Sequence, residues 1–175
     1  MRIYLVGFMG CGKSFSGRNL SRKLGFGFSD LDVLFENRYR VNIQEFFRKY
    51  GEATFRVVEQ QILYETESFH KVVISTGGGT PCYADNMDWM NQHGISIYLK
   101  MSPSSLYHRL SHSRKPRPLI KDYEPEALRQ FIRERLAIRE PYYNKASLIV
   151  PGENLNLNQL TETLTGIIEP STFPE

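Results

Sequence analysis

The sequence has few cysteines, no long apolar run and little net charge, and each absence argues against a class of protein. Its two cysteines, Cys11 and Cys82, both lie in glycine-rich turns and have no histidines at ligand spacing, which argues against a disulfide framework and a zinc site. No apolar stretch reaches the roughly 20 residues that span a bilayer. The chain also enters its first predicted strand without a signal peptide. We therefore expect a protein of the reduced cytoplasm with no membrane partner.

Size and charge favour one globular domain that acts on small molecules. Lysine and arginine outnumber aspartate and glutamate by 22 to 19, an excess too small to indicate nucleic acid by itself. A small positive charge does suit a site that attracts anions. The composition is 41% apolar and 23% charged, and 175 residues can bury a sizeable core. We expect a single domain over residues 1–175, a monomer that binds no nucleic acid.

Residues 7–14, GFMGCGKS, fit the G-x-x-x-x-G-K-[ST] pattern of a phosphate-binding loop. The apolar run at residues 3–6 predicts a buried strand just before it. After it, Phe15, Leu20 and Leu24 are assigned to one apolar helical face, which predicts a helix over about residues 12–24. Strand, glycine-rich turn and helix are the context that this motif requires. The loop is therefore predicted to bind a nucleotide.

The residue types of this loop suit a polyphosphate. Glycines at positions 7, 10 and 12 let the backbone bend tightly and turn its N–H groups inward. The start of the following helix adds unpaired N–H groups and the positive end of its dipole. Lys13 is expected to bridge the β- and γ-phosphates, and the hydroxyl of Ser14 to be a ligand of Mg²⁺. The alternative is a glycine-rich turn that matches by chance, and the flanking strand and helix weigh against it.

Strands and helices alternate along the rest of the chain, with no internal repeat or low-complexity linker. Asn42 fits a helix N-cap, and Gly51 interrupts a helical pattern. The predicted strands cover about residues 2–6, 30–32, 72–74, 95–99 and 148–150. The predicted helices cover about residues 12–24, 33–40, 42–50, 52–69, 84–92, 103–112, 125–143 and 157–168, and the tail at 169–175 is expected to fray.

This alternation predicts an α/β fold, a three-layer sandwich with a central parallel sheet of about five strands. Ligands of such sheets bind at the carboxyl ends of the strands. Here the first strand leads into the phosphate loop, the second ends in the pair Asp30 and Asp32, and the third leads into Gly77, Gly78 and Gly79. These three polar or glycine-rich features are expected to meet at one edge of the sheet.

Taken together, these motifs resemble the shikimate kinase family. The series is GFMGCGKS, SDLDV, FRVVE, STGGG, RPLI and REPYY, in the family's order and with family-like spacing over about residues 2–150. The phosphate loop alone would be generic, whereas the whole series is highly specific. The resemblance implies a nucleoside-monophosphate-kinase-like P-loop fold with a mobile lid. It also implies transfer of the γ-phosphoryl group of MgATP to the 3-hydroxyl of shikimate, within aromatic amino acid biosynthesis.

The resemblance implies roles for the residues at the first two strand ends. Asp30 would be a water-mediated partner of Mg²⁺. Asp32 would bind the hydroxyls of shikimate, either orienting the attacking O–H or also accepting its proton. On spacing alone, the two aspartates fit a solvated turn equally well. The phosphates of ATP would be wrapped by Gly10, Cys11, Gly12, Lys13, Ser14 and Phe15, of which Phe15 replaces a small hydroxyl residue and is expected to point into the helix core.

Arg56 and Arg139 match the arginines with which the family holds the carboxylate of shikimate, a role that suits a planar, permanently charged guanidinium. Glu59 follows Arg56 at a spacing that can hold this group in place. The triple glycine would let main-chain N–H groups approach the substrate, and Gly78 matches the family's contact. Without the resemblance, both arginines fit ordinary helix-surface positions and the triple glycine fits a flexible turn.

The resemblance places a lid over residues 113–123 and substrate-binding helices over about residues 33–69. The lid stretch, SRKPRPLIKDY, contains two prolines and a group of basic residues. Arg117 would swing over the phosphates and stabilise charge as the γ-phosphoryl group leaves, and the closed lid would exclude water. Arg109 matches the family's arginine against the adenine. The alternative is an exposed loop whose arginines only favour solubility.

Other functions also use a phosphate loop. A gluconate or adenylate-type kinase would not need the triple glycine together with Arg56 and Arg139 in this arrangement. A GTPase-type switch would carry Asn-Lys-x-Asp, whereas the nearest stretch, NKAS at residues 144–147, lacks the aspartate and lies at a helix end. A catalytically inactive ATP-binding homologue is the third alternative, although every expected polar residue is present.

Overall fold

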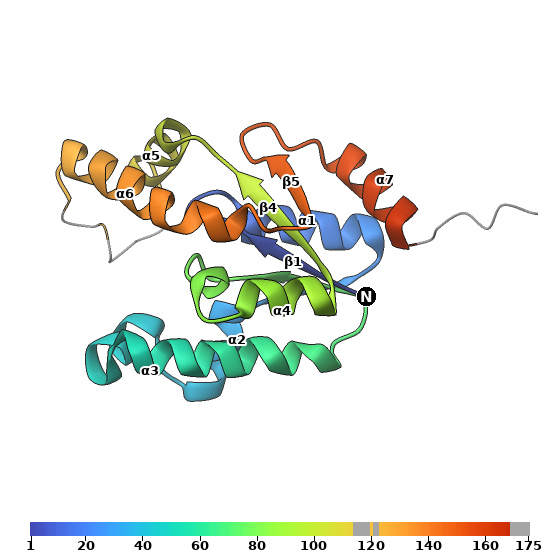
Figure 1. Cartoon of the computed structure of the whole chain (residues 1–175), viewed down its shortest axis with the longest axis horizontal. Coiled ribbons are helices and arrows are strands. Elements are labelled where there is room, and N and C mark those ends of the chain that lie inside the picture. Colours follow the sequence, from blue (N-terminus) through green and yellow to red (C-terminus); the bar gives the residue numbers. More distant parts are fainter. Residues whose placement is uncertain (114–119, 121–122, 169–175) are drawn as a thin grey trace, which may run out of the picture.

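The centre of the molecule is a sheet of five parallel strands in the order β2-β3-β1-β4-β5 (Figure 1). The computed structural model describes residues 1–113, 120 and 123–168. The first strand of the sequence is the middle strand of the sheet, so the loop after β1 emerges between the loops after β3 and β4. The strands are β1 (Arg2–Val6), β2 (Gly27–Asp30), β3 (Val72–Ser75), β4 (Ile95–Lys100) and β5 (Leu148–Pro151).

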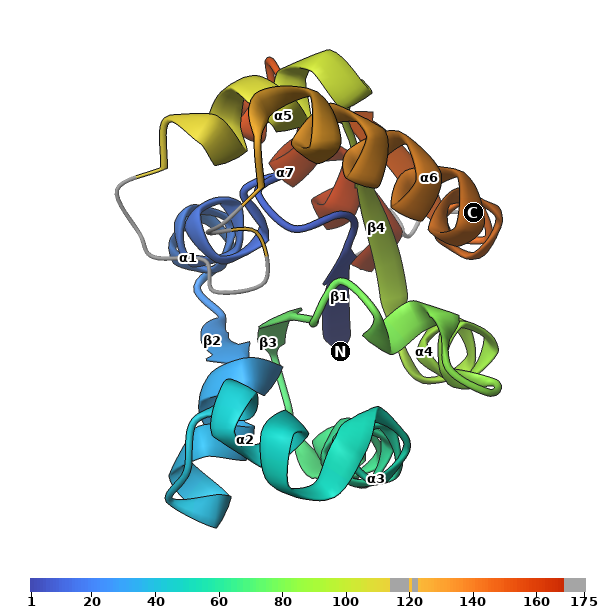
Figure 2. The ribbon, with the colours of Figure 1, turned by 90° about the vertical axis from the view of Figure 1, so that its left-hand side faces the viewer.

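Helices cover both faces of the sheet, which confirms the predicted three-layer α/β fold. On one face α1 (Lys13–Leu24) packs against α7 (Leu157–Ile168), and on the other lie α4 (Asn86–His93) and α6 (Pro125–Tyr143) (Figure 2). Helices α2 (Leu31–Tyr39) and α3 (Ile43–Glu65) form a pair at the β2–β3 side, and α5 (Pro103–Ser111) packs on α6. The 3₁₀ turns η1 (Thr66–Ser68) and η2 (Thr80–Cys82) follow α3 and β3.

The central strands are apolar on both sides because both faces of the sheet are covered. Every residue of β3 is buried, as are residues 3–6 of β1 and 96–99 of β4. These strands share one apolar cluster with Leu20 from α1 and Ile132 from α6. The sheet is therefore a rigid base for the loops at its carboxyl ends.

Local signals act at helix ends as predicted. The side chain of Asn42 accepts a hydrogen bond from the N–H of Glu45 at 2.8 Å and satisfies one of the unpaired donors of α3. Gly51 has φ 80° and ψ 168°, so α3 is kinked there, in agreement with the predicted break. Ser102 caps α5 through a 3.2 Å hydrogen bond from the N–H of Ser105, and Pro103 takes the first helical position.

Two sequence-based expectations are wrong. Strand β2 ends at Asp30, whose side chain caps α2 by accepting a hydrogen bond from the N–H of Asp32 at 3.1 Å, so Asp32 lies in the first turn of the helix. Phe15 is 75% exposed and does not point into the core. Leu20 is five positions further on, which is about 140° around the helix axis, so the two side chains do not share a face.

Within the part of the chain that the structure describes, no helix is long and apolar enough to cross a membrane. The predicted lid at residues 113–123 lies mostly outside the described residues, and the predicted tail at 169–175 lies wholly outside them. Ile120, from the lid stretch, is buried and belongs to the apolar core.

Candidate active site

The phosphate loop joins β1 to α1, and three glycines give it its shape. Gly7, Gly10 and Gly12 have φ values of 142°, 83° and 99°, which residues with a side chain rarely adopt. A Cβ atom at Gly10 would also lie 2.9 Å from Cδ2 of Leu110. The loop therefore needs glycine both for its backbone conformation and for its packing against α5.

Lys13 is buried within this loop. Its Nζ donates hydrogen bonds to the carbonyl oxygens of Gly7 at 2.8 Å and Phe8 at 3.0 Å, and it lies 3.8 Å from Sγ of the buried Cys11. Among the described residues Lys13 forms no ion pair, so its charge faces neutral main-chain acceptors. An anionic phosphate oxygen would be a stronger acceptor than these carbonyl groups.

Three side-chain oxygens meet beside the ends of two neighbouring strands. They belong to Asp30 at the end of β2, Ser75 at the end of β3 and Ser14 in the first turn of α1. The Ser14 hydroxyl donates to Oδ2 of Asp30 at 2.6 Å and lies 3.3 Å from Oγ of Ser75. In the described parts of the chain, no group of three or more histidine, cysteine, aspartate or glutamate side chains could hold a metal. Mg²⁺ usually takes one or two carboxylates with water and phosphate oxygens. The cluster fits Mg²⁺, and Ser75 was not among the residues predicted for it.

Asp32 faces the triple-glycine loop from the first turn of α2. A Cβ atom at Gly77 would lie 3.3 Å from Oδ1 of Asp32. Asp32 is exposed as a whole residue, yet desolvation of its carboxyl group by the surrounding atoms raises its pKa from 3.8 to about 6, and the carboxylates of Asp30 and Glu59 act in the same direction. A carboxylate with this pKa accepts a proton near neutral pH more readily than an ordinary aspartate.

Glu59 is a buried carboxylate that holds Arg56 in place. Its Oε2 accepts a hydrogen bond from Nη1 of Arg56 at 2.6 Å, and its Oε1 accepts one from the Thr80 hydroxyl in η2. Glu52 makes a second contact to Arg56, at 3.1 Å from Nη2. The pairing predicted from the spacing of Arg56 and Glu59 is confirmed. The link to Thr80 joins residues 21 positions apart, which no local sequence signal reveals.

Each glycine of the triple-glycine loop lies against a charged side chain. A Cβ atom at Gly77 would lie 2.6 Å from Oε1 of Glu59, and one at Gly78 would lie 3.2 Å from Nη1 of Arg139. At Gly79, a Cβ atom would overlap the guanidinium group of Arg56. The loop therefore has no side chains of its own at the positions where side chains from other elements pack against it. This requirement for glycine comes in addition to the main-chain access predicted from the sequence.

Arg139 reaches this loop from the C-terminal part of α6, four residues before the helix ends. Its guanidinium carbon lies 5.7 Å from the ring centre of Phe8, an arrangement that favours a cation over an aromatic face. Helices α3 and α6 lie on opposite sides of the loop between β3 and α4 (Figure 2). Arg56 and Arg139 therefore approach adjacent glycines from two directions. Two guanidinium groups in this arrangement suit a carboxylate ligand.

Arg109 connects the phosphate loop to the loop after β5. Its Nη1 donates to the carbonyl oxygen of Cys11 at 3.1 Å and its Nη2 to that of Gly152 at 3.2 Å. This position fits its predicted place on the nucleotide side. Arg117 lies outside the described residues. Phe15 lies in the first turn of α1, where main-chain N–H groups are available to a phosphate.

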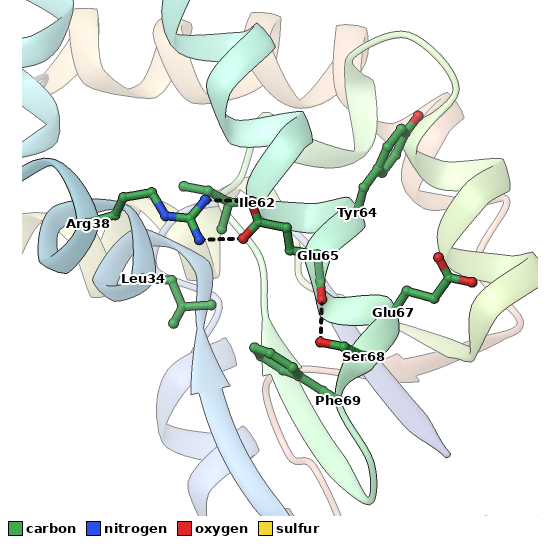
Figure 3. A pocket seen from close by; sticks show the side chains of 8 residues that line it. All are labelled: Leu34, Arg38, Ile62, Tyr64, Glu65, Glu67, Ser68 and Phe69. Atoms are coloured by element: carbon green, nitrogen blue, oxygen red, sulfur yellow. Dashed lines mark hydrogen bonds and ion pairs between the residues drawn. The ribbon is translucent and has the colours of Figure 1, made fainter.

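A cavity of about 620 Å³ lies at the other end of α2 and α3, and it includes the ion pair between Arg38 and Glu65 (Figure 3). Its lining contains none of the predicted site residues. Glu65 follows Arg56 by nine residues, which is about 14 Å along a helix at 1.5 Å per residue. The cavity is therefore separate from the site at the carboxyl ends of the strands.

Comparison with known proteins supplies the family. A model of the shikimate kinase family matches residues 9–169. The chain belongs to the shikimate kinase family. A curated shikimate kinase from Parabacteroides distasonis is 43% identical over 154 residues, which are 88% of this chain and 89% of that relative.

Solved shikimate kinases share the fold. The structure from Bacteroides thetaiotaomicron has a TM-score of 0.90 and 38% identity, with 97% of this chain and 98% of that chain covered. The enzyme from Acinetobacter baumannii, solved in complex with shikimate, has a TM-score of 0.83 and 33% identity, with coverage of 99% and 95%. The resemblance seen in the sequence motifs is confirmed, and as a member of the shikimate kinase family the chain is an ATP-dependent P-loop kinase.

Proposed function

We propose that this protein transfers the γ-phosphoryl group of MgATP to the 3-hydroxyl group of shikimate. One observation carries the proposal: Asp32, Arg56 and Arg139 meet at the triple glycine, and the phosphate loop ends on the same edge of the sheet. A polyphosphate and an acidic polyol would therefore lie side by side. Family membership supports ATP as the donor, and a solved family member binds shikimate.

The phosphate loop would hold ATP through its main-chain N–H groups and through Lys13, which would exchange its two carbonyl acceptors for β- and γ-phosphate oxygens. Ser14 and Asp30 would hold Mg²⁺, with Asp30 acting through water. When bound, this ion neutralises charge on the β- and γ-phosphates. Arg109 would lie against the adenine, since it already spans the loops after β1 and β5.

Asp32 would accept a hydrogen bond from the attacking hydroxyl and so direct it at the γ-phosphorus atom. Its raised pKa lets the same carboxylate take up the hydroxyl proton as the new oxygen–phosphorus bond forms. Phosphoryl transfer depends mostly on positioning and charge stabilisation. Orientation of the hydroxyl is therefore the larger part of this residue's contribution.

Arg56 and Arg139 would bind the carboxylate of shikimate through paired N–H···O bonds. Glu59 keeps Arg56 in position before the substrate arrives. This arrangement favours an acidic, hydroxyl-rich acceptor over a nucleoside monophosphate. Gly78 and its neighbours would add main-chain donors to the hydroxyl groups.

Family membership also supports a lid at residues 113–123, in which Arg117 would stabilise charge on the departing phosphoryl group and the closed segment would exclude water. Residues 33–69 would form the acceptor side of the site. We further propose that residues 1–175 act as one domain and as a cytoplasmic monomer. Its partners would be ATP and shikimate, with no nucleic acid and no membrane.

A coupled assay for ADP release with a panel of acceptors tests this proposal. We expect turnover with shikimate and Mg²⁺, no turnover with gluconate or nucleoside monophosphates, and loss of turnover when EDTA removes the metal. Phosphorus NMR should place the new ester on the 3-hydroxyl group. Turnover of gluconate but not shikimate, or ATP hydrolysis without a phosphorylated acceptor, would reject the proposal.

A further inference from the structure

Tyr143, the last residue of α6, is fully buried and donates a hydrogen bond to the carbonyl oxygen of Gly78 at 2.5 Å. The two residues are 65 positions apart in the sequence. The ring of Tyr143 packs against Tyr98 of β4 with ring centres 5.1 Å apart, which fixes the direction of the hydroxyl group. Burial raises the pKa of the Tyr143 phenol, so it remains a donor at neutral pH.

Arg139 lies one turn earlier in α6. Tyr143 follows it by four residues, so both side chains leave the helix on one face. Nη1 of Arg139 occupies the space beside Cα of Gly78, 3.2 Å from where a Cβ atom would lie. Glu140 pairs with Lys100 of β4 at 2.9 Å and holds this turn onto the sheet. Helix α6 therefore contacts Gly78 twice, through a phenol and through a guanidinium group.

A hydrogen bond to the carbonyl of Gly78 also determines the direction of the next N–H group. The peptide bond between Gly78 and Gly79 is planar and trans, so the N–H of Gly79 points opposite to that carbonyl. Among the residues described, neither the N–H of Gly78 nor that of Gly79 has an acceptor. With glycine on both sides, this peptide would otherwise rotate with little steric resistance.

We propose that Tyr143 is a positioning residue for the acceptor site, one that holds the Gly78–Gly79 peptide so that a main-chain donor meets the acceptor bound by Arg139. The inference rests on the proposed function, because the donor is offered to shikimate. Tyr143 does not touch the acceptor in this role. It acts through the peptide of the triple-glycine loop.

The test is Tyr143→Phe, which removes one hydroxyl group and keeps the ring. The KM for shikimate should rise about threefold to tenfold, as expected for the loss of one buried hydrogen bond. The KM for ATP should stay unchanged, because the lost hydrogen bond joins Tyr143 to the triple-glycine loop and not to the phosphate loop. The matched control is Tyr98→Phe on the adjoining ring, whose buried hydroxyl makes no hydrogen bond to the triple-glycine loop among the described residues. This control should leave both KM values unchanged.

A rise in the shikimate KM alone, with the thermal midpoint close to that of the wild type, supports the positioning role. An unchanged shikimate KM would overturn it. Equal losses for both substrates together with a lower midpoint would also overturn it, because the residue would then only stabilise the fold. If the wild-type protein fails to phosphorylate shikimate, both the proposed function and the positioning role are rejected. The assay of the wild-type protein alone gives this result, so it is distinguished from a failure of the positioning role.

Discussion

The nucleotide side and the acceptor side of this site are built in opposite ways. The proposed nucleotide side comes mainly from one stretch, residues 7–14, in which the main chain and Lys13 would supply the contacts to ATP. The acceptor side collects Asp32 from α2, Arg56 from α3 and Arg139 from α6 around a loop of glycines. A main-chain cradle depends on local backbone conformation. A cluster of side chains depends on how distant helices pack, so small packing changes should affect the acceptor side more.

The charges on the two sides are also held differently. Lys13 contacts neutral carbonyl groups, whereas Arg56 is already paired with Glu52 and Glu59. The carboxyl group of Asp32 is partly desolvated and lies near the carboxylates of Asp30 and Glu59, and this unfavourable environment raises its pKa. The acceptor side therefore gives up some stability to keep its functional groups in place, as active sites often do.

The largest effect is expected for Lys13→Ala, which should impair the use of ATP without impairing shikimate binding. The kcat/KM for ATP should fall about 10²–10³-fold, since a preorganised donor to the phosphates is lost. Calorimetry should show that shikimate binding is nearly unchanged. Lys23→Ala, in the exposed last turn of α1, is the matched control and should behave as the wild type. Equal losses of affinity for ATP and for shikimate would show that the nucleotide side and the acceptor side are not independent.

The next effect concerns pH and Asp32. Its carboxyl group has a pKa of about 6 in the folded protein against an ordinary 3.8, so the folded state binds more protons between these values. The stability of the protein should therefore fall as the pH rises from about 4 to about 6, and should stay lower above that window. Asp32→Asn cannot ionise and should lack this slope. At about pH 7 it should be more stable by about 1 kcal/mol or less, because solvent around the exposed residue screens much of the effect, while it should lose most phosphoryl transfer.

Urea unfolding at about pH 4.5 and about pH 7.5 measures this slope for both proteins. Asp88→Asn serves as the control, because Asp88 is an exposed carboxylate paired with Lys145 at the surface. An Asp32→Asn variant that keeps the wild-type slope would show that another group is responsible for it.

A smaller effect is expected when a glycine of the triple-glycine loop is given a side chain. In Gly79→Ala the new methyl group would overlap the guanidinium group of Arg56, which must then move. Shikimate affinity should fall about tenfold to hundredfold, in line with the cost of overpacking, and ATP affinity should not change. Gly166→Ala in α7, where nothing lies within 4 Å of the added atom, should retain both affinities. Wild-type shikimate binding by Gly79→Ala would contradict the side-chain origin of the acceptor site.

The smallest effect compares the two carboxylates that flank Arg56. Glu59→Gln should lower the free energy of unfolding by about 1–2 kcal/mol, because a buried charged hydrogen bond is weakened. Glu52→Gln should cost less than about 0.5 kcal/mol, since exposed ion pairs contribute little. The side chains of these residues are 5% and 63% exposed. Equal losses in chemical denaturation would show that burial does not set the difference.

Much of the fold could be predicted because its signals act within a few residues. The bounds predicted for α6 and α7 agree with the structure, as does the N-cap at Asn42. The errors arose where a local pattern allows two readings. Asp30 both ends β2 and caps α2, so the strand predicted over residues 30–32 ran into the helix, and Phe15 looks apolar in a sequence window although it faces solvent. The roles of Arg117 and of the lid stay predictions.

By itself, the sequence determined the phosphate loop, the alternation of strands and helices, and the series of motifs that marks the family. Only the tertiary structure decided that Glu59 joins Arg56 to Thr80, that each glycine of the triple makes room for a charged group, and that Tyr143 reaches Gly78. The physical reason is the range of the forces involved. Backbone conformation and periodicity depend on neighbours a few residues away, whereas these contacts depend on where helices from distant parts of the chain pack against the same loop.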